Sequence, residues 1–261
     1  MSPRLDALRA LPPPLLFGHR GVRGARAENT IAAIRLAAEE GADGVEIDVR
    51  PCKSGELVVI HDADLARVTG GRDRRRVADL ALRDLEKIEL AEGDGPPSLR
   101  RVLELTKHLG LALNVELKRD VPWRLGAVRA LVRELARTPG EQAIVVSSFD
   151  PAMLLAFRAL DRATPTALLV EPVGLARHLE RGAQWFGRFV HPEHTMVTGA
   201  RLARWKHHGL TVVTWTVNDA AEIERLLALG VDGIITDVPS AARPLVERAR
   251  AARPKVSQTP S

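Results

Sequence analysis

The chain has 261 residues, of which 45% are hydrophobic and 27% charged, a composition that can supply a full hydrophobic core for a globular protein. The net charge of +5 comes from arginines spread over predicted helix faces, where water solvates them. Only 3% of the residues are aromatic and tyrosine is absent, so the composition argues against a stacking surface for nucleic acid.

The N-terminal sequence MSPRLDALRALPPPLL lacks the apolar core of a secretory signal, and no apolar run approaches the roughly 18 residues of a transmembrane helix. The single cysteine, Cys52, excludes an intramolecular disulfide, and the sequence is therefore compatible with a reducing compartment. We therefore expect a cytoplasmic protein without a transmembrane segment. Its oligomeric state stays open.

Short apolar segments alternate with longer amphipathic ones along the chain. Eight apolar segments predict strands buried on both faces, as in a parallel sheet: 15–19, 44–49, 111–117, 143–149, 166–171, 188–191, 210–217 and 232–237. Helices are predicted between nearly all of them, at 29–41, 98–110, 123–137, 151–160, 200–209, 220–230 and 239–252. This alternation indicates one (β/α)8 TIM barrel over residues 1–251, followed by a flexible C-terminal tail at 252–261.

One interval breaks the alternation. After the strand at 44–49, the sequence PCKSGE is too short for a crossover helix, so we expect a β-hairpin that turns near Ser54. This hairpin would place Asp48 roughly opposite His61. The polar segment 62–97, rich in glycine and proline and with a helical middle, predicts a small insertion on the barrel.

Polar side chains stand at the carboxyl ends of the predicted strands, where the active sites of TIM barrels lie. They are His19, Arg20, Glu46, Asp48, His61, Glu116, Lys118, Ser147, Ser148, Trp215, Asn218 and Asp237. Three carboxylates of this set, Glu46, Asp48 and Glu116, would repel one another unless one is protonated or a cation lies among them. Oxygen ligands suit one divalent cation, Mg2+ or Ca2+. The alternative is a set of ordinary ion pairs with Arg20, Arg50 and Lys118.

The remaining polar residues fit the chemistry of a phosphate group. His19 and His61 are candidates for general acid and base, since imidazole titrates near neutral pH. The alternative for each is a structural hydrogen bond. Arg20 offers a fork of donors for phosphate, and Lys118 offers a point charge. Trp215 would either form a wall of the pocket or pack inside the barrel.

Two further histidines, His191 and His194 in the motif HPEH, are weaker candidates for a second metal site. We expect His191 to end a strand and to line the pocket. His194 is expected on a loop.

The motifs occur in a fixed order: GHRG (18–21), AENT (27–30), GADGVEIDVRPCKSGELVVIHD (41–62), LARVTG (65–70), PPSLRRVLEL (96–105), NVELK (114–118), SSF (147–149), TWTVND (214–219) and IITDVP (234–239). This ordered set resembles the glycerophosphodiester phosphodiesterase family, TIM barrels related to phosphatidylinositol phospholipase C. The resemblance implies metal-dependent hydrolysis of small-molecule glycerophosphodiesters, such as glycerophosphocholine or glycerophosphoethanolamine, to glycerol 3-phosphate and an alcohol. It also implies acid/base roles for His19 and His61, cation ligation by Glu46, Asp48 and Glu116, and phosphate contacts from Arg20 and Lys118.

The chain departs from the family pattern at Ala27, Cys52 and Ser54, where proline, threonine and aspartate are usual. These positions lie in a helix lead-in and a turn, so the departures concern local geometry. Three alternatives remain at this point. They are a lysophospholipase D, a phospholipase-C-like lyase that leaves a cyclic phosphate, and a non-catalytic module that binds phosphodiester headgroups.

Overall fold

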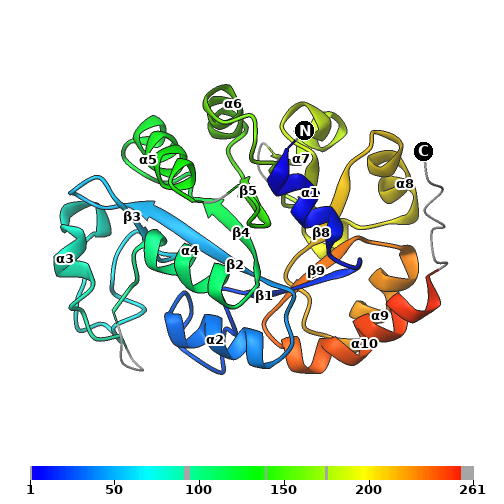
Figure 1. Ribbon diagram of the computed structural model, residues 1–261, viewed down its shortest axis with the longest axis horizontal. Coiled ribbons are helices and arrows are strands. Elements are labelled where there is room, and N and C mark those ends of the chain that lie inside the picture. The colour runs from blue at the N-terminus through cyan, green and yellow to red at the C-terminus, as the bar shows by residue number, and fades with distance from the viewer. Residues whose placement is uncertain (1, 91–94, 139, 174–175, 254–261) are drawn as a thin grey trace.

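The computed structural model describes residues 2–90, 95–138, 140–173 and 176–253, and it contains a closed barrel of eight parallel strands (Figure 1). The strands are β1 (Leu15–His19), β2 (Gly44–Pro51), β4 (Ala112–Leu117), β5 (Ile144–Ser148), β6 (Thr166–Val170), β7 (Phe189–Pro192), β8 (Thr211–Thr214) and β9 (Gly233–Thr236). Strand β1 pairs in parallel with both β2 and β9 and so closes the sheet on itself. The predicted (β/α)8 barrel is therefore confirmed.

Helices lie around the outside of the strands (Figure 1). They are α2 (Ile31–Glu39), α4 (Leu99–His108), α5 (Arg124–Ala136), α6 (Pro151–Leu160), α7 (Ala176–Leu179), α8 (Gly199–His207), α9 (Ala220–Leu229) and α10 (Pro239–Ala252). Side-chain oxygens cap the first turns of most of them, which explains why their starts were predicted closely: Thr30, Ser98, Asp150, Thr198 and Asp219. Among the described helices, none combines the length and the apolar character needed to cross a membrane.

The barrel interior is apolar toward the amino-terminal ends of the strands. Side chains such as Phe17, Val145 and Phe189 form a buried cluster there. The unpredicted helix α1 (Pro3–Ala10) adds Leu8 to this cluster. The buried guanidinium of Arg4 on the same helix donates hydrogen bonds to the Thr164 hydroxyl at 2.6 Å and the Leu135 carbonyl at 2.7 Å. The apolar interior below leaves the carboxyl-terminal end of the barrel for polar side chains.

The predicted hairpin is present. Strand β3 (Leu57–Val59) runs antiparallel to β2, and Gly55 takes a left-handed conformation, with a φ of 91°, in the turn between them. The Ile60 amide donates to the Asp48 carbonyl at 2.9 Å, so His61 follows directly after the residue opposite Asp48. The structure thereby confirms the expected approach of His61 to the end of β2.

The insertion after the hairpin is less helical than predicted. Its described part holds only short helical turns, η1 (Val77–Asp79) and α3 (Leu82–Leu85), the second of which lies at the left edge of Figure 1. Its apolar residues Leu65, Val77 and Leu85 instead form one buried cluster with Cys52, Val58 and Ile60 of the hairpin. Residues 91–94 of the insertion and residues 254–261, most of the predicted tail, lie outside the described residues.

Candidate active site

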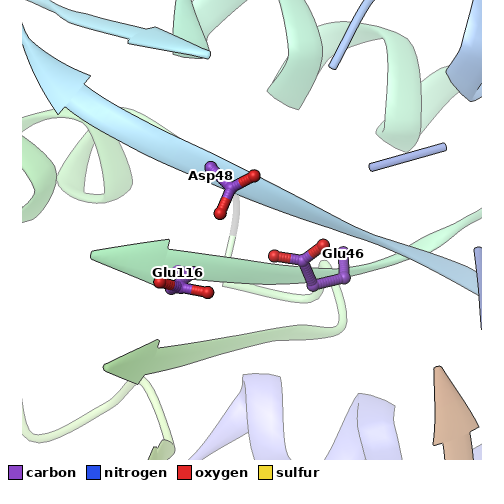
Figure 2. A group of neighbouring side chains, drawn as sticks. All are labelled: Glu46, Asp48 and Glu116. Carbon is purple, nitrogen blue, oxygen red and sulfur yellow. The ribbon is translucent and has the colours of Figure 1, made fainter. Parts of the chain in front are cut away.

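Three carboxylates converge at the carboxyl-terminal end of the barrel, as Figure 2 shows. Glu46 and Asp48 extend from β2, and Glu116 extends from β4. The strand register pairs Asp48 with Glu116, and the two-residue spacing turns Glu46 to the same face. One oxygen from each carboxylate lies within 4.8 Å of the other two, and all three residues are buried. The grouping predicted from the sequence is therefore present.

The charges around these carboxylates are unevenly balanced. The Lys118 ammonium lies 2.7 Å from Glu116 and 3.2 Å from Asp48, and Arg20 Nε lies 3.1 Å from Asp48. Among the described residues, Glu46 has as its ion-pair neighbour only the Nε2 atom of His19, at 4.0 Å, and it accepts a hydrogen bond from the Arg20 amide. Ion pairs thus form with Lys118 and Arg20, but they leave Glu46 without a charged partner in hydrogen-bond contact.

The pKa values follow this imbalance. Burial, with repulsion from Asp48 and Glu116, raises the pKa of Glu46 well above its usual value. Burial also raises the pKa of Glu116, although Lys118 opposes the shift. Burial favours the neutral form of Asp48 as well, but Lys118 and Arg20 outweigh it and hold the pKa of Asp48 well below its usual range. A set of three carboxylates, one of them uncompensated, fits a hard divalent cation such as Mg2+ or Ca2+.

His19 ends β1 and is oriented by the aspartate that directly follows β9. Its Nδ1 lies 2.7 Å from Asp237 Oδ1. Asn218 in turn donates to Asp237 Oδ2 at 2.7 Å and accepts from the Asp237 amide at 2.8 Å. Burial favours protonation of this aspartate, yet the hydrogen bond with His19 lowers the pKa of Asp237. Because an ionised carboxylate only accepts, the proton of His19 sits on Nδ1 and leaves Nε2 for proton transfer.

His61 has the same arrangement on the hairpin side. Its Nδ1 lies 2.6 Å from Asp62 Oδ1, and Arg67 donates to the other oxygen of Asp62 at 2.6 Å. The Arg50 guanidinium donates to the His61 carbonyl at 2.7 Å and pairs with Asp120. Arg50 is therefore no partner of the carboxylate cluster. Burial lowers the pKa of His61, whereas the nearby Asp48 opposes this shift.

The loop after β1 holds Arg20 in place. Arg20 takes a left-handed conformation, with a φ of 53°, and donates to Glu28 at 2.8 Å. Asn29, also left-handed, donates to Asp48 Oδ2 at 2.9 Å and accepts from the Asp48 amide at 3.2 Å. A Cβ on Gly18 would lie 2.2 Å from the Gly21 carbonyl oxygen, so only glycine permits this tight turn.

These side chains surround one cavity of about 340 Å3. Of the twelve strand-end residues predicted, eight were given a role in acid/base chemistry, metal binding or substrate binding, and seven of these line the cavity: His19, Arg20, Glu46, His61, Glu116, Lys118 and Trp215. Asp48 stands behind them, its oxygens in contact with Asn29, Lys118 and Arg20. Trp215 follows β8, and its indole N–H donates to the His191 carbonyl at 2.8 Å while its ring flanks the cavity. Of the two positions expected for Trp215, the structure therefore favours the wall of the pocket over packing inside the barrel.

The model of the glycerophosphoryl diester phosphodiesterase family matches residues 19–241, which include every residue of this site. The chain belongs to this family. It is 34% identical to the putative glycerophosphodiester phosphodiesterase YhdW of Bacillus subtilis, over 86% of this chain and 94% of that protein. It is 31% identical to a glycerophosphodiester phosphodiesterase of Caldanaerobacter subterraneus, over 90% and 98% of the two chains.

Solved structures agree with this assignment. A putative glycerophosphoryl diester phosphodiesterase from Silicibacter pomeroyi superposes with a TM-score of 0.85 at 27% identity, covering 95% of this chain and 98% of that one. A phosphodiesterase from Oleispira antarctica, solved with the product sn-glycerol-3-phosphate, superposes with a TM-score of 0.80 at 25% identity, covering 90% and 97%. The protein is accordingly a phosphoric diester hydrolase, a glycerophosphodiester phosphodiesterase.

Several supporting residues of this phosphodiesterase site were not assigned roles from the sequence. Glu28 joins Arg20 to Arg67, which donates to it at 2.7 Å, and so ties the insertion to the loop after β1. Asp62 and Asp237 orient the two histidines. The motifs AENT and IITDVP contain Glu28 and Asp237, but only the folded chain brings such distant carboxylates to their partners.

The second histidine motif does not contribute to the phosphodiesterase cavity. His191 lies on β7 but is fully buried. The expectation that it lines the cavity is wrong, since it is not among the cavity's lining residues. Burial lowers its pKa to about 3. His194 begins the turn η3 (His194–Met196) and pairs with Glu222 at 2.9 Å. Within the described ranges, neither histidine belongs to a group of three or more metal-ligating side chains.

Proposed function

We propose that this phosphodiesterase hydrolyses glycerophosphodiesters such as glycerophosphocholine to glycerol 3-phosphate and an alcohol, with one divalent cation and with His19 and His61 as acid and base. The observation that carries the proposal is the shared cavity. Two histidines, each held by a carboxylate at Nδ1, line the same space as a buried carboxylate cluster. The product named for the Oleispira antarctica structure supports glycerol 3-phosphate as the product here.

Glu46, Asp48 and Glu116 would hold Mg2+ or Ca2+, which when bound supplies positive charge to the phosphate oxygens. Arg20 and Lys118 line the cavity beside this cluster and add fixed positive charge for the same oxygens.

The two histidines divide the proton transfers. One accepts a proton, at Nε2, from the nucleophile as the new P–O bond forms. The nucleophile is either water or the substrate's own neighbouring hydroxyl, and in the second case water then opens the cyclic phosphate to give glycerol 3-phosphate. The other donates a proton to the alkoxide that leaves as the old P–O bond breaks. Asp237 and Asp62 keep the two rings oriented and Nδ1 protonated. Which histidine is the base stays open in this proposal.

The test is release of glycerol 3-phosphate from glycerophosphocholine with Mg2+, with Ca2+ and with chelator. We expect metal-dependent release that falls about 100- to 10,000-fold in His19→Ala and His61→Ala. The exposed His108→Ala on α4 is the matched control and should retain activity. Undiminished release by both cavity variants, or full activity in chelator, would overturn the proposal.

A second candidate substrate class is the lysophospholipids. Two apolar side chains on loops that follow β4 and β6 favour it, since Trp123 is 61% and Val173 67% exposed. Neither lines the cavity, so we rank this substrate second. Lysophosphatidylcholine in the same assay, with 31P NMR of the product, separates lysophosphatidic acid from a cyclic phosphate and hence hydrolase from lyase chemistry.

A further inference from the structure

The cavity has two chemically different sides. Arg20 and Arg23, which follow β1, and Lys118, which follows β4, place positive charge on one side, where a bound divalent cation would offset the carboxylates of Glu46 and Glu116. The side that follows β5, β6 and β8 carries no cation among its lining residues and instead presents two aromatic rings and a carboxylate: Phe149, Glu171 and Trp215. A cavity that is cationic on one side and aromatic and anionic on the other is complementary to a zwitterion.

The two rings form a fixed wall. The Phe149 and Trp215 ring centroids lie 5.5 Å apart at an interplanar angle of 86°, an edge-to-face contact. The hydrogen bond from the indole of Trp215 to the His191 carbonyl holds the second ring in place. Aromatic faces attract alkylated ammonium groups, and a rigid pair loses little conformational entropy when it binds one.

One of the chain's own cations already contacts this wall. The guanidinium carbon of Arg119 lies 5.2 Å from the Phe149 ring centroid, and its Nη1 lies 3.1 Å from Glu171 Oε1. The Arg119 side chain is 49% exposed, and an exposed ion pair of this kind contributes little free energy. The guanidinium of Arg119 therefore marks a position beside Phe149 and Glu171 that attracts a cation. A substrate cation can readily displace the Arg119 side chain from this position.

We propose that Phe149, Glu171 and Trp215 form a cation subsite that binds the ammonium group of the substrate's leaving alcohol, so that the enzyme prefers phosphodiesters of choline-like or ethanolamine-like alcohols. The phosphate lies toward Arg20 and Lys118, and Arg119 swings away when the ammonium group enters. This inference rests on the proposed function, because it names the alcohol that the same site releases.

Steady-state kinetics test the subsite with two substrates that differ in the charge of the alcohol, glycerophosphocholine and glycerophosphoglycerol. The readout is the ratio of their kcat/KM values. We expect this ratio to favour glycerophosphocholine in the wild type and to fall about ten-fold in Glu171→Gln, which corresponds to the loss of one charge-assisted contact with the ammonium group. In Arg119→Gln the ratio should rise, since the competing cation is gone. The exposed Glu39→Gln on α2 is the control and should leave the ratio unchanged.

A binding measurement separates this inference from the proposed activity. Calorimetry with phosphocholine should show binding to the wild type and about ten-fold weaker binding to Glu171→Gln, whether or not hydrolysis occurs. Binding without hydrolysis would overturn the proposed function and leave the subsite standing. Equal affinity of both proteins for phosphocholine, or a ratio that Glu171→Gln does not move, would overturn the subsite. A parallel series with lysophosphatidylcholine shows whether the acylated or the deacylated source of the headgroup is preferred.

Discussion

Replacing Glu46 by glutamine should make the metal-free protein more stable while weakening its response to metal. Glu46 is buried with two other carboxylates within 4.8 Å, and no charged group of the part of the chain that the structure describes lies at hydrogen-bond distance from it. At an effective dielectric constant of about 20, two unit charges at that separation repel by about 3 kcal/mol. The attraction of Arg20 and Lys118 offsets part of this repulsion, so we expect a net gain of about 1 to 3 kcal/mol from Glu46→Gln near pH 7.

The pH dependence of this gain has a definite sign. Because the pKa of Glu46 is raised in the folded protein, ionisation above the ordinary glutamate pKa of about 4.3 costs folding free energy as the pH rises. Below that pH the carboxyl is neutral in both folded and unfolded chains. The advantage of Glu46→Gln should therefore be present at pH 7 and vanish near pH 4.

Thermal denaturation in chelator and in excess Mg2+ or Ca2+ measures both effects. In chelator the variant should melt about 2 to 10 °C above the wild type. Metal at 100 times its Kd should stabilise the wild type by about 2.7 kcal/mol and the variant by clearly less. The exposed Glu104→Gln on α4 controls for loss of a surface charge. A Glu46→Gln protein that melts below the wild type in chelator at pH 7 would refute the electrostatic reasoning.

Three further predictions concern supporting residues. Asp62→Asn removes the anion that favours the protonated form of His61. The limb of the pH–rate profile that reports His61 should therefore move to lower pH, and an unchanged profile would contradict the acid/base role of His61. Asn29→Ala keeps a β-carbon at a φ of 60° but removes the polar side chain that favours asparagine in this conformation and with it two hydrogen bonds with Asp48. Urea denaturation should show a loss of about 2 to 4 kcal/mol, and Asn29→Gly, which has no β-carbon, should partly recover it. Arg4→Met should cost about 1 to 3 kcal/mol of stability without changing kcat, and a changed kcat would contradict a purely structural role.

The barrel was predictable because its strands are apolar on both faces and its helices carry their own start signals. The carboxylate cluster was predictable for a related reason. Two-residue spacing on a strand turns Glu46 and Asp48 to one face, and parallel strands bring their carboxyl ends to one rim. The hairpin could be inferred because the loop after β2 is too short for a crossover helix. The inferred hairpin correctly predicted that His61 lies at that rim.

The other features of the site and its support could not be predicted, because they depend on contacts between distant residues that form only in the closed barrel. The helix that carries Arg4 has little apolar character, and its buried arginine is satisfied by partners more than 130 residues away. The pairing of His19 with Asp237 spans 218 residues and follows from closure between β1 and β9. His191 was misplaced because its position along a strand end does not reveal how deep in the barrel it lies.

The order of synthesis gives α1 an unusual place in folding. The partners of Arg4 follow it by 131 to 160 residues, and at about 5 to 20 residues per second they emerge roughly 7 to 32 s later. A helix of 8 residues is not stable alone in water during that interval. The segment that becomes α1 is therefore synthesised long before the barrel end on which it packs as a helix. His19 likewise gains its orienting carboxylate only when β9 has left the ribosome.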